Sequence, residues 1–284
     1  TNEGDSSKEN TSNSSEANSE NATTENQSSS ENDDVSESSS STASEQINDS
    51  TDSSEESNGS EDVTSSEESN NSEQSTSSEE ENPNFKITTS VVNGYTRNGN
   101  IYTIKSAGVY TLNGTLEGQI LIDAGDDDAV EIDLNGVDIS YNLDSPIRAV
   151  NADSLEVKSI KDTVNNITDN RSVKTDDTSD LGEGAINAKC DLKFTAKGTL
   201  NVVGKYNNGI HTTKDLKVKN TTINVTAYNN AIKGKDSIAI ESGTITAIST
   251  NGDGIETSNS DLSSKGKQRG DVTITGGTIN VYAA

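Results

Sequence analysis

The strongest constraint on the fold is an internal repeat in the second half of the chain. Tyr206-Asn207-Asn208 and Tyr228-Asn229-Asn230 each precede a small residue and an isoleucine, and they stand 22 residues apart. A period of this length is typical of a solenoid, in which one coil buries its apolar face only against neighbouring coils. The repeat therefore predicts stacked coils of similar length.

A small residue followed by isoleucine marks each coil. The four markers lie 24, 22 and 23 residues apart, at Ala185-Ile186, Gly209-Ile210, Ala231-Ile232 and Gly254-Ile255. Two short alternating runs rich in β-branched residues follow each marker, which is typical of strands with one buried face. A helix is excluded because no apolar stripe with a 3.6-residue period persists. We predict an all-β fold, a right-handed parallel β-helix with three strands per coil, in which the four isoleucines form one interior ladder.

The repeat extends upstream in a looser form. Asp126–Ser140 and Ser145–Ile167 are interpreted as two further coils, and Gly94–Gly125 supplies short strands that close the N-terminal end. Two insertions break the period, at Thr168–Gly184 and Thr257–Gly270. Long loops on a rigid scaffold commonly carry function.

The charge divides the 284 residues into two parts. Residues 1–82 carry 23 acidic residues and a single lysine, and are otherwise mostly Ser, Asn and Thr. Such a segment has too little apolar surface to offset the entropy of ordering, so we predict a disordered acidic spacer. Residues 83–284 are predicted to form one domain, truncated at its C-terminal end because no polar cap follows the last strand at Val281–Ala284.

Composition also limits the partners and the location. A net charge of −27 argues against nucleic acid, and no apolar run is long enough to span a membrane as a helix. A single cysteine, Cys190, excludes a disulfide framework. A polar spacer ahead of a β-rich domain suits a bacterial protein that is extracellular or attached to the cell surface, for example as a lipoprotein, and we expect a monomer.

Several segments together carry a resemblance to a known family. "NNGIHTTKDLKVKNTTINVTA", "NNAIKGKDSIAIESGTITA" and the run that begins "GDGIETSN" resemble successive parts of bacterial extracellular carbohydrate-binding domain-containing proteins. The best-described type of that family is a β-helix that binds cellulose and polygalacturonate. The resemblance implies a right-handed parallel β-helix similar to pectate lyases, bound calcium, binding of acidic polysaccharides and no established catalysis. The family's Asp-Gly-Ile pattern is kept only at Asp253-Gly254-Ile255.

The first candidate calcium site lies around that pattern. Asp253 and Glu256 flank Gly254-Ile255, and stacking should bring Asn230 and Asn208 of the neighbouring coils close to Asp253. Calcium prefers six to eight oxygen ligands of this kind. The alternative is an asparagine ladder, in which the amides bond along the solenoid axis.

A second candidate calcium site is the cluster Asp126, Asp127 and Asp128. Three carboxylates in one turn repel one another unless a cation or water separates them. A solvated turn is the alternative interpretation.

The candidate carbohydrate-binding residues lie next to the markers. His211 and Lys233 directly follow the marker isoleucines and should point outward, with Lys235 close by and Tyr206 and Tyr228 at equivalent coil positions. Lysine pairs with a uronate carboxylate, and tyrosine stacks on a sugar ring. An ordinary solvated face is the alternative.

We therefore predict a non-catalytic, calcium-assisted module that binds acidic plant cell-wall polysaccharides such as polygalacturonate, or cellulose. One alternative is a calcium-dependent enzyme like pectate lyase, which needs a positioned base, commonly arginine or lysine. Arg97, Arg148, Arg171 and Arg269 do not align with a calcium-ligand cluster. The other alternative is a structural surface stalk or adhesin.

Overall fold

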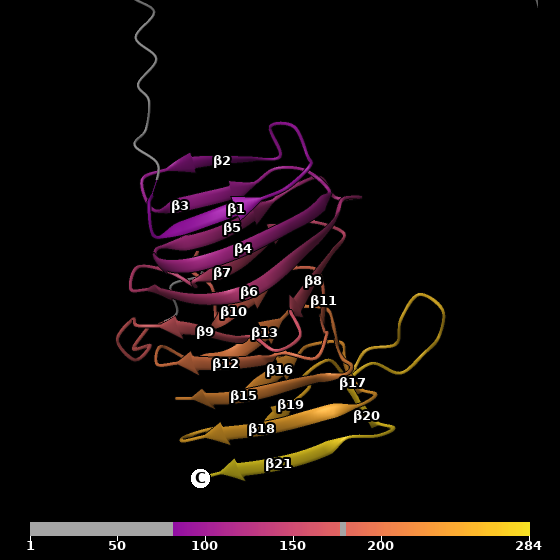
Figure 1. Ribbon diagram of the computed structural model, residues 1–284. Coiled ribbons are helices and arrows are strands. Elements are labelled where there is room, and N and C mark those ends of the chain that lie inside the picture. The colour runs from indigo at the N-terminus through magenta and orange to yellow at the C-terminus, as the bar shows by residue number, and fades with distance from the viewer. Residues whose placement is uncertain (1–81, 177–179) are drawn as a thin grey trace, which may run out of the picture. The chain divides into compact units, whose positions relative to one another are not determined.

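The computed structural model describes residues 82–176 and 180–284, and these residues form an all-β domain of stacked strands (Figure 1). The predicted spacer, residues 1–82, lies outside the described part except for Asn82. No described segment is an apolar helix long enough to cross a bilayer.

The strands form three stacks, and within each stack neighbouring strands run parallel. The first stack contains β3 (Ile101–Ile104), β5 (Gln119–Asp123), β7 (Ile147–Asn151), β10 (Gly184–Ala188), β13 (Asn208–Thr212), β16 (Ile232–Gly234) and β19 (Ile255–Glu256). The second stack contains β8 (Ser154–Ser159), β11 (Asp191–Thr195), β14 (Asp215–Val218), β17 (Ser237–Ile240) and β20 (Asp271–Ile274). The third stack contains β9 (Val164–Asp169), β12 (Thr199–Gly204), β15 (Thr221–Ala227), β18 (Gly243–Ser249) and β21 (Thr278–Ala283). Three strands therefore belong to each coil, as the repeat predicts.

One long strand joins the second and third stacks into a single curled sheet. β6 (Ala129–Tyr141) pairs with β8 through its first half and with β9 through its second half. β4 (Gly108–Glu117) pairs with β6 along most of its length. The observed architecture is thus a curled parallel sheet beside a second parallel sheet, and closure into a complete right-handed β-helix stays a prediction.

The N-terminal end departs from the parallel arrangement. β1 (Phe85–Thr88) pairs antiparallel with β4, and β2 (Tyr95–Asn98) pairs antiparallel with β3. The short strands predicted within Gly94–Gly125 are therefore present, with β1 as an additional strand.

The predicted isoleucine ladder is confirmed. Ile186, Ile210, Ile232 and Ile255 are aligned in register along the first stack, and Ile147 continues the line upstream. All but Ile255, which is half-buried, are at most 1% exposed. Fully burying each such side chain stabilises the fold by about 1.5–3 kcal/mol.

The small residue before each isoleucine has a packing reason. A Cβ atom at Gly209 would lie 2.2 Å from Cγ1 of Val225 and 2.7 Å from the carbonyl oxygen of Ala231. The corner that leads into the ladder is therefore too tight for a larger side chain at this coil.

Candidate functional site

The predicted outward row exists on the first stack. The register aligns Arg148, Asn187, His211, Lys233 and Glu256, one from each of five consecutive strands. The prediction that His211, Lys233 and Glu256 lie in one row was therefore correct.

Members of this row bind one another. Lys233 Nζ lies 3.0 Å from Glu256 Oε1, and the other oxygen of that carboxylate accepts a hydrogen bond from the Asn230 amide. His211 Nδ1 lies 2.8 Å from Asn187 Oδ1, which also accepts the backbone N–H of Glu183. Burial, and then the positive charge of Lys233, lower the pKa of His211 to about 4. His211 is therefore neutral near pH 7 and offers a uronate no charge.

The two candidate tyrosines lie in different environments. Tyr228 is 37% exposed and is free to meet a ligand at the coil corner. Tyr206 is only 7% exposed, and the guanidinium carbon of Arg171 lies 3.8 Å from its ring centroid. The prediction that Tyr206 presents an open ring to a sugar was wrong, because the insertion after β9 places Arg171 over it. Lys235, the fifth candidate, is exposed.

Asn208, Asn230 and Asp253 form a ladder between coils. The backbone N–H of Asn230 donates to Asn208 Oδ1 at 3.2 Å, and that of Asp253 donates to Asn230 Oδ1 at 2.7 Å. The amide of Asn208 donates to the carbonyl oxygen of Glu183 at 2.9 Å. The asparagine oxygens and both oxygens of Glu256 are thus already bonded, so the set does not fit a calcium site as it stands. Asp253 itself is exposed.

The aspartate cluster also does not converge on one point. Asp128 Oδ2 accepts the backbone N–H of Gly125 at 2.8 Å, whereas Asp126 and Asp127 are exposed. Within residues 82–176 and 180–284, no three His, Cys, Asp or Glu side chains are grouped so that they could hold a metal ion. The geometry therefore favours the solvated-turn interpretation for this cluster.

A buried ionic network anchors the first insertion. Arg171 Nη2 lies 2.6 Å from Oδ2 of Asp169, whose side chain is fully buried, and Arg171 Nη1 lies 3.7 Å from Asp144 Oδ1. Asp144 Oδ2 in turn accepts from Arg148 Nη1 at 2.5 Å. These arginines are engaged in structural ion pairs, which argues against either of them as a free catalytic base.

Sequence reasoning missed a groove on the outer side of the second stack. A hollow of about 480 Å³ crosses β8, β11, β14 and β17. Its polar lining comes from the outward positions of these strands: Ser154, Glu156, Asp191, Lys193, Asp215, Lys217 and Ser237. Alignment of the coils on their inward leucines could have found this row, because Glu156, Lys193 and Lys217 each follow such a leucine.

Two neighbouring lysines lie at the centre of this groove. Lys193 and Lys217 are direct register partners, and they are 42% and 44% exposed. Lys193 Nζ lies 2.8 Å from Glu156, and Lys217 Nζ lies 2.5 Å from Glu241. Although burial opposes its ionisation, hydrogen bonds from Lys193 and Thr195 lower the pKa of Glu156. The two lysines thus start from adjacent strand positions, and each ammonium group pairs with a glutamate on an opposite flank.

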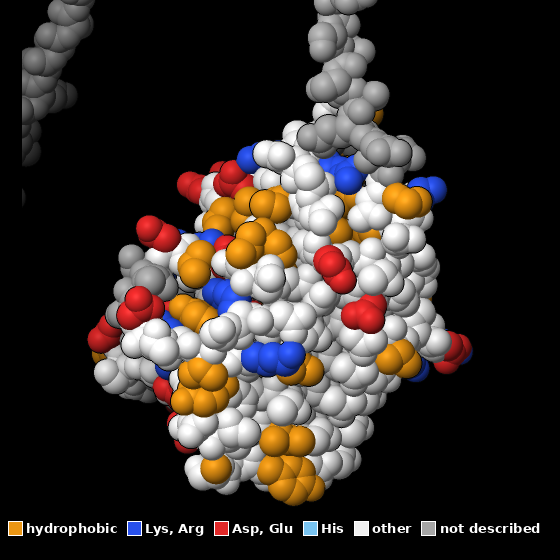
Figure 2. Space-filling view, turned by 90° about the vertical axis from the view of Figure 1, so that its left-hand side faces the viewer, with side chains coloured by type: hydrophobic (Ala, Val, Ile, Leu, Met, Phe, Trp, Pro, Cys, Tyr) orange, Lys and Arg blue, Asp and Glu red, His pale blue; other side chains and the backbone are white. Residues whose placement is uncertain are grey.

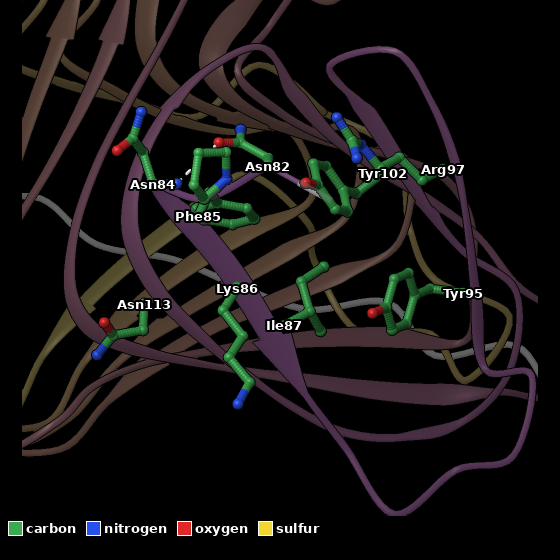
Figure 3. A pocket seen from close by; sticks show the side chains of 10 residues that line it. Asn82, Asn84, Phe85, Lys86, Ile87, Tyr95, Arg97, Tyr102 and Asn113 are labelled. Atoms are coloured by element: carbon green, nitrogen blue, oxygen red, sulfur yellow. Dashed lines mark hydrogen bonds between the residues drawn. The ribbon is translucent and has the colours of Figure 1, made fainter. Parts of the chain in front are cut away.

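A second hollow of about 540 Å³ lies at the N-terminal end of the domain (Figure 3). Phe85 and Tyr102, both 4% exposed, meet edge to face there with ring centroids 5.1 Å apart. Tyr102 is the register partner of Ile120 and so continues the interior ladder. The aromatic rings at this end therefore cover the core.

The stacked strands present rows of polar side chains on their outer sides. The sequence model of carbohydrate-binding domain-containing proteins matches residues 98–284. The chain belongs to this family.

Two relatives show the extent of the similarity. A carbohydrate-binding domain-containing protein of Acetivibrio thermocellus is 34% identical over 146 residues, which cover 51% of each chain. The present chain thus spans about half the length of this curated relative. The gadolinium derivative of a polysaccharide lyase-like protein from C. thermocellum is 32% identical, with a TM-score of 0.62 over 69% of this chain and 81% of that chain.

Proposed function

We propose that this protein is a non-catalytic polysaccharide-binding module that holds acidic glycans in the groove on the second stack. The observation that carries the proposal is the pair of partly exposed register partners Lys193 and Lys217 in a member of a carbohydrate-binding family. Each ammonium group has three N–H donors, of which its glutamate does not use all, and both lysines are partly exposed, so they can also bind the carboxylates of a uronate chain that lies along the groove. The neighbouring hydroxyl and carboxylate groups can bond the sugar hydroxyls.

The test compares two lysine variants. Replacing both groove lysines, Lys193→Ala with Lys217→Ala, should weaken binding to polygalacturonate by about tenfold or more, the effect of losing roughly 1.4 kcal/mol. Lys105→Ala is the matched control, since Lys105 is similarly exposed and paired, with Asp123, outside the groove. Equal affinity of the double variant and the parent in titration calorimetry would overturn the proposal.

Absence of catalysis is part of the same proposal. Arg148 and Arg171 are engaged in ion pairs, and burial raises the pKa of the Cys190 thiol to about 12, which makes it a poor nucleophile. The likeness to a polysaccharide lyase-like protein favours a lyase as the second candidate. Ultraviolet absorbance of unsaturated uronate products, measured with polygalacturonate as substrate, is expected to stay flat. A steady rise would establish the lyase.

Calcium assistance is a separate proposal that does not use the asparagine ladder. It relies on the exposed carboxylate of Asp253 at the corner before β19, outside the groove, where a calcium ion would link Asp253 to uronate oxygens of a glycan chain that extends beyond the groove, since calcium accepts ligands from both sources. With polygalacturonate present, calcium should raise the melting temperature of the parent but not of Asp253→Ala. Identical shifts in the two proteins would contradict the site.

We also propose an extracellular or cell-surface location, which fractionation of the producing cells tests.

A further inference from the structure

The groove on the second stack is lined by two parallel rows of opposite charge. Asp191 and Lys193 occupy outward positions two residues apart on β11, and Asp215 and Lys217 occupy the equivalent positions on β14. Residues two apart on a strand point to the same side and lie about 6.6 Å apart, whereas neighbouring strands lie about 4.8 Å apart. We call Asp191 and Asp215 the aspartate row, and Lys193 and Lys217 the lysine row. Both rows therefore run along the solenoid axis, next to each other in the groove.

The aspartate row has no cation of its own. Both of its residues are exposed, and within residues 82–176 and 180–284 no lysine or arginine forms an ion pair with either of them. Partial burial and the like charges of Asp215 and Asp153 raise the pKa of the Asp191 carboxyl, against a hydrogen bond from the backbone of Asp215. The negative charge of this row is therefore not neutralised by an ion pair.

Each carboxylate of the aspartate row keeps one oxygen that accepts no hydrogen bond from the described residues. Asp191 Oδ1 accepts the backbone N–H of Asp215 at 3.3 Å, and Asp215 Oδ1 accepts the hydroxyl of Ser237 at 2.7 Å. The two Oδ2 atoms remain for a ligand. An ionised carboxylate only accepts hydrogen bonds, and a lysine ammonium only donates them. A ligand in the groove must therefore donate to one row and accept from the other.

This separation of charges is a local feature of the groove. In Figure 2, acidic and basic side chains lie scattered among uncharged ones. On the first stack, a lysine and a glutamate of the same row pair with each other, as Lys233 does with Glu256. In the groove, by contrast, the carboxylates of the aspartate row and the ammonium groups of the lysine row stand apart. The two rows can therefore contact the two edges of an elongated ligand separately.

We propose that Asp191 and Asp215 are specificity-determining residues, which select acidic glycans whose carboxylates lie along only one edge of the chain. In an extended glycan with a two-fold repeat, successive sugars present their substituents to opposite edges. A polymer in which every sugar is a uronate therefore places carboxylates against the aspartate row, where like charges repel. A glycan in which uronates alternate with neutral sugars places its carboxylates on the lysine row and hydroxyl groups on the aspartate row. The inference rests on the proposed function of the groove and names the class of acidic glycan that it prefers.

The test measures the binding of two glycans by titration calorimetry at low salt, with a chelator present so that no divalent cation bridges carboxylates. Polygalacturonate is acidic at every sugar, and hyaluronan alternates glucuronate with a neutral sugar. Asp215→Asn keeps an acceptor for the Ser237 hydroxyl but removes a charge from the aspartate row. It should bind polygalacturonate about fivefold more tightly than the parent does, a gain of roughly 1 kcal/mol, and hyaluronan equally tightly. Asp138→Asn is the matched control, because it removes an exposed charge of β6 outside the groove, and it should change neither affinity.

The possible results separate this inference from the proposed function. Unchanged or weaker binding of polygalacturonate by Asp215→Asn overturns the inference, and so does an equal gain for both glycans, which would reflect net charge alone. A parent that binds polygalacturonate but not hyaluronan also overturns it, and leaves the groove as a site if Lys193→Ala with Lys217→Ala binds less tightly. If the parent binds neither glycan, or if that lysine variant binds both as tightly as the parent, the proposed function fails and the inference fails with it. Thermal melts verify that each variant folds.

Discussion

His211 is the only histidine of the chain, so its titration can be isolated by a single substitution. Burial and Lys233 lower its pKa from 6.5 to about 4 in the folded protein. As the pH falls below about 6.5 the unfolded chain takes up a proton, while the folded protein remains unprotonated there until about pH 4. Stability is therefore fully present above pH 6.5 and is lost as the pH falls toward 4. At about pH 5 the loss amounts to about 2 kcal/mol.

The assay is urea unfolding of the parent and His211→Asn at about pH 7, 6 and 5. Asparagine keeps an N–H donor for Asn187 Oδ1, which His211 Nδ1 now contacts at 2.8 Å, but it does not titrate. Carboxylates that titrate in the same range affect both proteins alike. The parent should lose about 2 kcal/mol relative to His211→Asn between pH 7 and pH 5. A difference in unfolding free energy that is independent of pH would refute the assignment of a low pKa.

Two further predictions concern the core and the anchored insertion. Ile210→Ala removes a fully buried ladder residue and should lower the unfolding free energy by about 2–5 kcal/mol, measured by urea titration at pH 7. Arg171→Ala leaves the fully buried carboxylate of Asp169 without its main partner and should cost about 3–5 kcal/mol, whereas a loss below 1 kcal/mol would show that water replaces the arginine. The double change Arg171→Ala with Asp169→Ala should be less destabilising than Arg171→Ala alone, which a double-mutant cycle measures.

The interior was predictable from sequence because its period is enforced at every coil. A slip of one residue in the first stack would turn Ile210 outward and bring His211 inward, so the pattern admits one register. The outward row followed from the same register. Its chemistry did not, because the ion pair of Lys233 with Glu256 and the neutral state of His211 depend on side-chain packing between coils.

The groove and the covered tyrosine were missed for different reasons. Lys193 and Lys217 stand 24 residues apart and become partners only when the second strands of successive coils are aligned. A comparison centred on the marker isoleucines does not make this alignment. Tyr206 repeats the position of Tyr228, so periodicity predicts the same environment for both. The insertion that carries Arg171 follows no period, and only the folded structure shows that it packs on one tyrosine and not the other.

A solenoid separates functions by stack, because each outward position of the repeat generates a row on one side. In the first stack, outward side chains bond to one another, as Lys233 does to Glu256. The insertion that Asp169 and Arg171 hold in place covers this stack further. In the second stack, Lys193 and Lys217 are partly exposed in a groove. In the third stack, the outward side chains include Thr199 and Thr222, which are half-buried, and Thr244, which is exposed. Substitutions on one side leave the rows of the other sides in register, since the interior ladder sets that register. The outward residues of each stack can therefore be replaced one coil at a time without altering the fold.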